Sequence, residues 1–219
     1  MSRHPTPWLI EGPRGTTAAP HDGAQGIPAA VLFDRDGTLV EDVPYNGDPA
    51  LVRLAPTARS AVEAVRAAGI PVGVVSNQSG VARGLLTRVQ VEAVGRRVEE
   101  LLGPFAVWAI CPHGPGDGCG CRKPAPGLVL AACERLGVPA GRAAVIGDIG
   151  ADTDAARAAG ARGVLVATPV TRAEEIEAAD TVAPDLLTAV GLLLTPRGTA
   201  RPAAAACAPA TGSGEGRRR

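Results

Sequence analysis

The chain has 219 residues, enough for one domain with a full core, and 46% of them are hydrophobic although only 2% are aromatic. Its 22 basic and 22 acidic residues balance, so the composition offers no general attraction to nucleic acid or to an anionic membrane. No apolar run approaches the length of a membrane span, and charges and prolines interrupt the first residues where a signal peptide would need an apolar stretch. We therefore expect a cytoplasmic protein.

The composition divides the chain into three parts. Residues 1–27 are rich in Pro, Gly, Ala and Thr without periodicity and are predicted to be a disordered leader, and residues 196–219 are predicted to be a disordered tail. Residues 28–195 form the expected domain. In it, strands are predicted at residues 30–33, 71–76, 105–111, 143–147 and 163–166, and helices at 56–68, 87–102, 127–136, 151–159 and 184–194. This alternation predicts an α/β fold with a parallel sheet and helices on both faces.

The first predicted strand ends in a pair of carboxylates. The apolar residues 29–33 run directly into Asp34-Arg35-Asp36-Gly37-Thr38. Ligands bind at the carboxyl ends of strands in open α/β sheets, and two residues that are two apart on a strand point to the same side. One carboxylate could attack a substrate while the other handles a proton or helps to hold a cation.

A second acidic site follows the strand at residues 143–147. Asp148 ends that strand, and Asp152 lies in the predicted helix that comes next. Asp152 could equally be a helix-capping residue, because carboxylates are stabilised at helix N-termini. Bringing Asp34, Asp36 and Asp148 to one sheet edge would make an oxygen-lined site suited to Mg²⁺.

Two further residues have the chemistry to bind a phosphate. Ser76 ends the second predicted strand and opens the polar run Ser76-Asn77-Gln78-Ser79-Gly80, which offers side-chain and backbone donors to an anion. Lys123 is the only lysine in the chain, and a compact ammonium can approach a single oxygen more closely than a planar guanidinium can. Together with the carboxylates and Mg²⁺, these groups are what phosphoryl transfer through an aspartyl-phosphate needs.

In this order the motifs resemble those of the haloacid dehalogenase (HAD) superfamily of phosphatases. Phe33 to Leu39 is similar to motif one, Ser76 to motif two, Lys123 to motif three, and Gly147-Asp148 with Asp152 to motif four. The resemblance implies a Rossmann-like HAD core, with Asp34 as nucleophile and Asp36 as general acid and base. It also implies that Asp34, the backbone carbonyl of Asp36 and Asp148 hold Mg²⁺. Ser76 and Lys123 would stabilise the phosphoryl group.

A cluster of soft ligands lies just before Lys123. Cys111, His113, Cys119 and Cys121 fall within eleven residues, a composition that suits tetrahedral Zn²⁺. The alternative is a disulfide, which His113 and a cytoplasmic setting disfavour. With four protein ligands the site would be closed, so we expect a structural zinc loop at residues 111–121. The remaining cysteines, Cys133 and Cys207, need no role.

This cluster narrows the resemblance to the zinc-loop phosphatases, HAD subfamily IIIA, which act on D-glycero-D-manno-heptose 1,7-bisphosphate or on histidinol phosphate. The resemblance implies a phosphoric monoester hydrolase (EC 3.1.3.-) of carbohydrate metabolism that removes the 7-phosphate of the heptose bisphosphate. No segment between the motifs is long enough for a large cap domain. The substrate contacts that it implies are Asp42, Tyr45, Ser76, Asn77, Gln78, Ser79, Arg122 and Lys123.

Other functions remain open at this stage. The interval between His113 and Cys119 is closer to that of the histidinol-phosphate enzymes, which makes histidinol phosphate the alternative substrate. A catalytically inactive zinc-loop binding module is the alternative from a different class, although the complete set of acidic residues and Lys123 argues against it. Nucleic-acid binding is disfavoured by the balanced charge and the few aromatic residues. We expect a monomer whose partner is a small phosphorylated metabolite.

Overall fold

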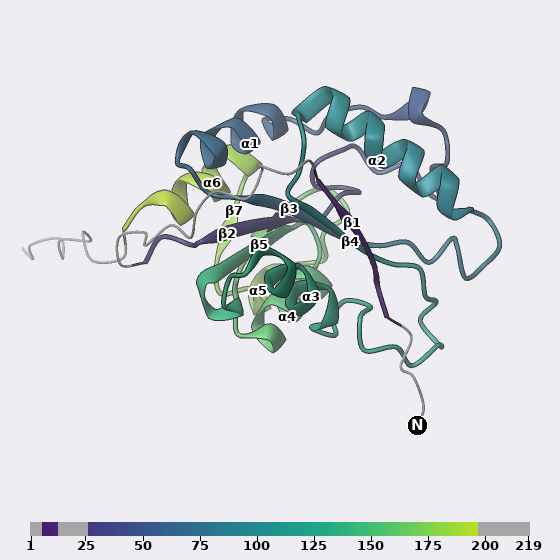
Figure 1. The fold of residues 1–219 in the computed structure, drawn as a ribbon. Helices are drawn as coiled ribbons and strands as arrows, with labels where there is room; N and C mark the ends of the chain where they lie inside the picture. Colours follow the sequence, from purple (N-terminus) through teal and green to yellow (C-terminus); the bar gives the residue numbers. More distant parts are fainter. Residues whose placement is uncertain (1–5, 13–25, 197–219) are drawn as a thin grey trace, which may run out of the picture.

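The computed structural model describes residues 6–12 and 26–196. Within these ranges, seven strands form one sheet in the order β1-β4-β3-β2-β5-β6-β7, and helices cover both of its faces (Figure 1). Neighbouring strands are parallel, except that β1 at the edge pairs antiparallel with β4. The predicted α/β fold with a largely parallel sheet is confirmed.

The predicted elements occur with small shifts at their ends. The strands are β1 (Trp8–Glu11), β2 (Ala30–Phe33), β3 (Val72–Asn77), β4 (Val107–Cys111), β5 (Ala143–Gly147), β6 (Arg162–Val166) and β7 (Val182–Ala183). The helices are α1 (Ala58–Ala67), α2 (Arg88–Leu102), α3 (Gly127–Leu136), α4 (Gly150–Ala159), α5 (Ala173–Ala178) and α6 (Leu186–Leu194), with short 3-10 helices η1 (Pro49–Leu51) and η2 (Ala140–Arg142). The short elements β1, α5 and β7 were not predicted.

Strand β1 corrects the prediction that the whole of residues 1–27 is a disordered leader. Ile10 pairs with Trp108 across the β1–β4 ladder and packs against the buried core, while Leu9 on the other face is exposed. An ion pair of 2.6 Å between Glu11 and Arg135 ties β1 to α3. The partner strand lies far along the chain, so local periodicity carries no signal for this pairing. Residues 1–5 and 13–25 of the predicted leader, and residues 197–219 of the predicted tail, lie outside the described residues.

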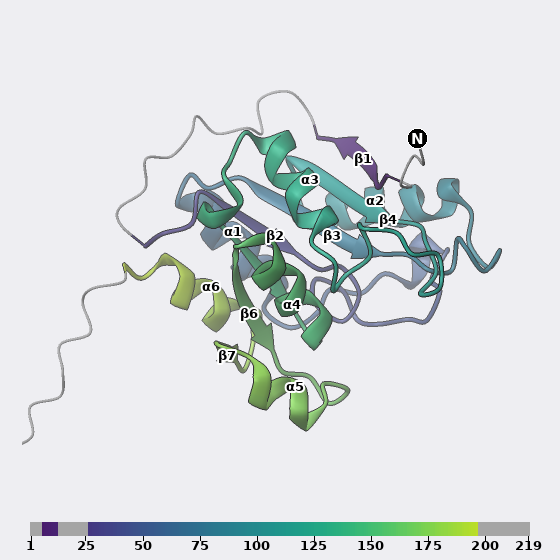
Figure 2. The ribbon, with the colours of Figure 1, turned by 90° about the horizontal axis from the view of Figure 1, so that it is seen from below.

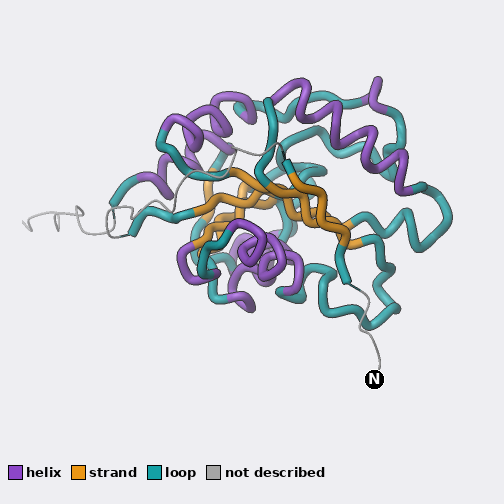
Figure 3. Tube along the Cα trace, viewed as in Figure 1, coloured by secondary structure: helices purple, strands orange, loops and turns teal. Residues whose placement is uncertain are grey.

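Two apolar cores lie on the two faces of the sheet. Helices α1, α2 and α6 cover one face, and α3 and α4 cover the other (Figures 1 and 2). The tube trace shows the strands as a middle layer between the helices (Figure 3). On the α1 face the core includes Phe33, Phe105 and Trp108, whereas the α3 face is filled by smaller side chains such as Leu128 and Val145. None of the described helices combines the length and apolar character needed to cross a membrane.

The central strands bring the predicted chemistry together. Strand β2 lies between β3 and β5 and runs parallel to both. Asp34 follows β2 directly, Ser76 lies at the end of β3, and Asp148 follows β5. The topology therefore places these three residues at the same carboxyl edge of the sheet.

Candidate active site

Three buried carboxylates form the centre of the site. One oxygen from each of Asp34, Asp148 and Asp152 lies within 4.8 Å of the others. Asp34 and Asp148 extend from the ends of β2 and β5, and Asp152 reaches in from the first turn of α4. Asp152 is fully buried and therefore belongs to the site as well as to the start of the helix.

Two glycines make room for this cluster. Gly37 has a φ of +79°, and a Cβ there would lie 2.3 Å from Asp148 Oδ2. A Cβ on Gly147 would lie 2.2 Å from Asp152 Oδ2. Both distances are too short for a Cβ atom, so only glycine fits at these two positions beside the carboxylates. Thr38, next to Gly37, donates a 2.8 Å hydrogen bond to Asp148 Oδ1 and fixes the orientation of that carboxylate.

The ammonium of Lys123 forms ion pairs with two carboxylates of this cluster. Its Nζ lies 2.5 Å from Asp34 Oδ1, 2.6 Å from Asp152 Oδ1 and 2.8 Å from the carbonyl oxygen of Val75. The side chain is 2% exposed. Burial alone lowers the pKa of Lys123, but the attraction of Asp152 and Asp34 outweighs it, so its pKa lies above the ordinary value. Lys123 is therefore a permanent ammonium at the centre of the site.

One ammonium does not balance three carboxylates. Burial, and then the charge of Asp152, raises the pKa of Asp148 to about 6. Burial also raises the pKa of Asp34 well above its ordinary value, although Lys123 opposes this effect. Oδ1 of Asp152 is buried and, apart from its ion pair with Lys123, has no hydrogen-bond partner among the described residues. An excess of buried negative charge on carboxylate oxygens fits a hard divalent cation such as Mg²⁺.

The side chain of Asp36 lies outside this cluster. Arg35 donates to its carboxylate from both Nε and Nη2, at 2.9 and 2.7 Å, and Gln78 Nε2 donates at 2.8 Å. The expectation that the carboxylates of Asp34 and Asp36 point to the same side assumed a continuing strand, whereas the assignment of Asp36 to the Mg²⁺ site through its backbone carbonyl stays a prediction. Because β2 ends at Phe33, residues 34–36 turn instead, which leaves the carboxylate of Asp36 free for a different task.

The end of β3 connects Asp36 to the predicted phosphate-binding residues. The side-chain amide of Gln78 bridges Asp36 and Ser76 Oγ, the latter at 2.9 Å, and both Ser76 and Gln78 are buried. Asn77 exchanges two 3.1 Å hydrogen bonds with the main chain of Lys123, one in each direction. The side chain of Asn77 is thus engaged in holding Lys123 in place, a role that the sequence-based assignment to substrate binding did not foresee.

The remaining predicted contact residues come from loops around the site. Asp42 is exposed, and its pKa is raised by partial burial and then by the nearby charge of Asp36. Tyr45 adopts a positive φ of 52° and lies under the guanidinium of Arg83, 5.6 Å from the ring centre. Arg122 is half-buried, and its Nη1 lies 3.4 Å from the carbonyl oxygen of His113. The side chain of Ser79, at the turn after β3, is half-buried.

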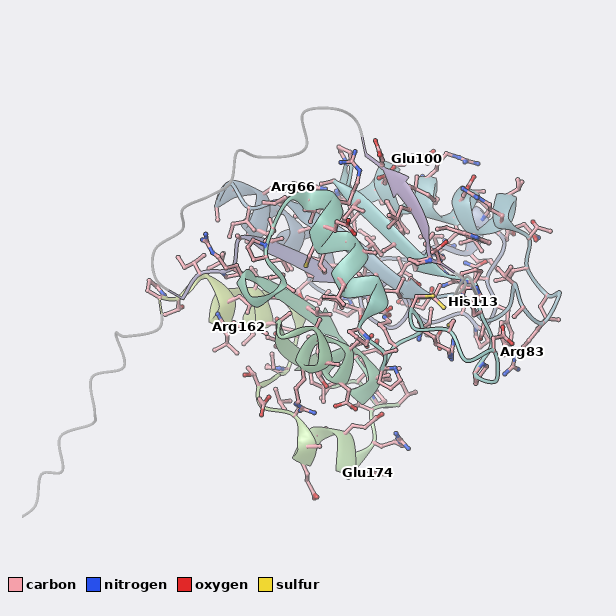
Figure 4. All side chains as sticks on the ribbon, turned by 60° about the horizontal axis from the view of Figure 1, so that its bottom comes forward. Arg66, Arg83, Glu100, His113, Arg162 and Glu174 are labelled. Carbon is pink, nitrogen blue, oxygen red and sulfur yellow. The ribbon has the colours of Figure 1, made fainter. Side chains whose placement is uncertain are left out.

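The four predicted zinc ligands meet at one point. His113 Nδ1 lies 3.4 Å from Cys111 Sγ and 3.3 Å from Cys121 Sγ, and Cys111 Sγ lies 3.4 Å from Cys121 Sγ and 3.7 Å from Cys119 Sγ. Tetrahedral Zn²⁺ with bonds of about 2.3 Å to sulfur would place sulfur ligands roughly 3.8 Å apart. All four cysteines among the described residues are free thiols, and Figure 4 places His113 beside sulfur atoms. The donor set and its spacing fit zinc.

The cluster is connected to the phosphate-binding loops. Gln78 N donates to the carbonyl oxygen of Cys111 at 2.7 Å, and Ala82 N donates to that of Pro112 at 3.1 Å. Lys123 follows the last cysteine by two residues. A metal that fixes residues 111–121 would therefore fix both the turn after β3 and the approach to Lys123.

Sequence reasoning missed two partners of the predicted residues. Arg35 lies within the first motif, but nothing in its sequence indicates that it is 2% exposed and paired with Asp36. Thr171 donates a 2.6 Å hydrogen bond to the carbonyl oxygen of Asp148 from the segment between β6 and α5. A single threonine in a loop has no recognisable pattern, so only the structure could identify it.

The comparisons with known proteins agree with this geometry. Residues 120–189 match the family model described as "HAD-hyrolase-like". The chain is 37% identical over 147 residues to the D-glycero-beta-D-manno-heptose-1,7-bisphosphate 7-phosphatase of Pseudomonas aeruginosa, covering 63% of this chain and 80% of that protein. It is 41% identical over 169 residues to the same enzyme of Mesorhizobium japonicum, covering 72% of this chain and 75% of that protein.

A solved structure supports the same assignment. The crystal structure of D,D-heptose 1,7-bisphosphate phosphatase from B. bronchiseptica, complexed with magnesium and phosphate, aligns with a TM-score of 0.67 and 28% identity. The alignment covers 75% of this chain and 98% of that one. The chain therefore belongs to the heptose-1,7-bisphosphate 7-phosphatase family of HAD phosphatases.

Proposed function

We propose that this phosphatase removes the 7-phosphate of D-glycero-D-manno-heptose 1,7-bisphosphate with the help of Mg²⁺. The observation that carries the proposal is the Asp34, Asp148 and Asp152 cluster bridged by Lys123, in a chain related to heptose bisphosphate phosphatases along most of their length. Mg²⁺ would be held by the carboxylates of Asp34 and Asp148 and the backbone carbonyl of Asp36. When bound, the ion would neutralise charge on the phosphoryl oxygens.

The residues divide the reaction between them. Asp34 attacks phosphorus and forms an aspartyl-phosphate while the bond to the sugar oxygen breaks. Asp36 gives its proton to that leaving oxygen and then takes a proton from the water that releases phosphate. Lys123 and Ser76 stabilise the charge on the transferring group. Asp152 holds the ammonium of Lys123, because its buried Oδ1 lies 2.6 Å from Nζ.

The zinc site has a structural role in this account. Four protein ligands leave no open position on a tetrahedral Zn²⁺, so Cys111, His113, Cys119 and Cys121 would close the loop rather than react. The loop would in turn hold Arg122 beside Lys123. Arg122 is the candidate for contact with the second phosphate of a bisphosphate substrate, because a half-buried guanidinium can bind a phosphate through two hydrogen bonds.

The test is phosphate release in the presence of Mg²⁺ from both anomers of the heptose 1,7-bisphosphate and from histidinol phosphate. We expect a much higher kcat/KM for the heptose, with ³¹P NMR showing loss of the 7-phosphate and retention of the 1-phosphate. Asp34→Asn serves as the inactive control. A preference for histidinol phosphate would overturn the substrate assignment, and release from none of these compounds would overturn the proposal as a whole.

A further inference from the structure

A segment between β6 and α5 binds the turn that carries Asp148. Thr171 Oγ1 donates to the carbonyl oxygen of Asp148 at 2.6 Å. Thr171 Oγ1 itself accepts a 2.9 Å hydrogen bond from the backbone N–H of Thr168 and lies 3.1 Å from the hydroxyl oxygen of Thr168. The hydroxyl of Thr171 is therefore fixed by its own loop and directed at the main chain of the site.

Glu175 contacts the same turn at Gly150, two residues after Asp148. Its side chain lies against Gly150, where an added Cβ would come within 3.2 Å of Glu175 Oε1, and Arg172 Nη2 donates to its carboxylate at 2.8 Å. The hydrogen bond from Arg172 is the main cause that lowers the pKa of Glu175 to about 2. The side chain of Glu175 is 12% exposed, whereas that of its neighbour Glu174 is 71% exposed and lies at the outer end of the molecule (Figure 4).

The turn held in this way sets the position of two active-site carboxylates. Asp148 begins it, and its side chain lies in the cluster with Asp34. The next residue, Ile149, donates from its backbone N–H to Asp152 Oδ2 at 3.3 Å, while Oδ1 of Asp152 faces Lys123. A shift of the main chain between Asp148 and Gly150 would therefore move both carboxylates.

We propose that Thr171 and Glu175 are positioning residues that hold this turn in the geometry required for cation binding. The inference rests on the proposed function, in which Asp148 is a Mg²⁺ ligand. Neither side chain belongs to the carboxylate cluster, so their effect passes through the backbone of residues 148–150. Partners that orient metal ligands typically alter metal affinity by about 10-fold to 100-fold when they are removed.

The test compares Thr171→Val with Thr171→Ser in the full chain. Valine keeps the shape but loses the hydroxyl, whereas serine keeps the hydroxyl. Isothermal titration with MgCl₂ measures affinity directly, and the Mg²⁺ dependence of kcat is measured in parallel. We expect Thr171→Val to weaken Mg²⁺ binding by about tenfold or more, with Thr171→Ser close to the unmodified protein.

A second pair keeps the test decisive if Thr171→Val folds poorly. Glu175→Gln removes the charge that lies against Gly150 and pairs with Arg172, and its matched control is the exposed Glu174→Gln. We expect weaker Mg²⁺ binding in Glu175→Gln and unchanged binding in Glu174→Gln. Circular dichroism confirms that each variant is folded.

The outcomes separate this inference from the function on which it rests. If the unmodified protein binds Mg²⁺ and both Thr171→Val and Glu175→Gln bind it equally well, the positioning role is wrong and the proposed function stands. An equal loss in Thr171→Val and Thr171→Ser would also overturn the role of the hydroxyl. If the unmodified protein does not bind Mg²⁺, the metal assignment fails together with the inference.

Discussion

At the scale of single residues, the site depends on charges that are buried together. Lys123 is surrounded by Asp34, Asp152 and the carbonyl oxygen of Val75, all within 2.8 Å of Nζ. This environment explains why the only lysine of an otherwise arginine-based chain lies here. A guanidinium is planar and larger, so it could not make the same three contacts in a fully packed position.

We therefore predict that Lys123→Arg lowers kcat by at least about 100-fold, the usual effect of losing one donor to a developing charge. Steady-state kinetics with the heptose bisphosphate would measure it. The matched control is Arg122→Lys at the adjacent, half-buried position, which should raise KM while changing kcat little. Unchanged kcat in Lys123→Arg would contradict the role given to the ammonium.

Single residues also show where sequence reasoning succeeds and where it stops. Asp34, Asp148, Lys123 and the four predicted zinc ligands could be located because each belongs to a motif at a strand end or in a short loop. The orientation of the Asp36 carboxylate could not, because it depends on contacts with Arg35 and Gln78 that only the folded chain creates. The same holds for Thr171, whose partner Asp148 is 23 residues away.

At the scale of elements, strong local signals predicted the helices and central strands. A capping box opens α2, with Gln90 N donating to Thr87 Oγ1 at 3.3 Å and Thr87 N donating to Gln90 Oε1 at 2.9 Å. Helix α1 begins two residues later than predicted, at Ala58, because Thr57 takes a positive φ of 60° and its side chain does not cap the helix. Strand β1 was not predicted because its partner strand, β4, lies far away along the sequence.

Strand β1 should contribute to stability and not to catalysis. Ile10 packs against the core while Leu9 is 42% exposed on the opposite face of the same strand. We predict that Ile10→Asp lowers the free energy of unfolding by about 1–3 kcal/mol through lost burial. Leu9→Asp, the control, should change it little, and both variants should keep the kcat of the unmodified protein. Urea unfolding measures the difference, and equal effects of the two substitutions would contradict the structure of this edge.

The zinc loop is the element that should be most sensitive to metal removal. Residues 111–121 contain four glycines and little apolar surface, so a metal would supply much of their order. We predict that Cys119→Ser abolishes bound zinc and lowers Tm by about 5 °C or more, since 1 kcal/mol moves Tm by roughly 2–4 °C in a chain of this size.

Elemental analysis and thermal unfolding would measure both effects. Cys133→Ala is the control, because Cys133 is buried on α3 away from the cluster and burial raises the pKa of its thiol to about 11. Retained zinc in Cys119→Ser would contradict the assigned ligand set.

At the scale of the whole molecule, the fold assembles a site from segments that are far apart in sequence. The residues that meet at the sheet edge come from the ends of β2, β3 and β5, from the segment just after the zinc loop and from the start of α4. Between Thr38 and Ser76 the described chain forms η1, α1 and most of β3, with no separate cap domain. We propose that the loops around Tyr45 and Arg122 select the substrate, which would explain why the sequence predicts the reaction more firmly than the substrate.

The most direct test of the account is to trap the covalent intermediate. Rapid acid quench of the enzyme mixed with Mg²⁺ and the heptose bisphosphate, followed by mass spectrometry of peptides, would locate any phosphorylated residue. We predict a mass increase of one phosphoryl group on the peptide that contains Asp34, and its loss in Asp34→Asn. A phosphoryl group on another residue, or turnover by Asp34→Asn near that of the unmodified enzyme, would contradict the central claim.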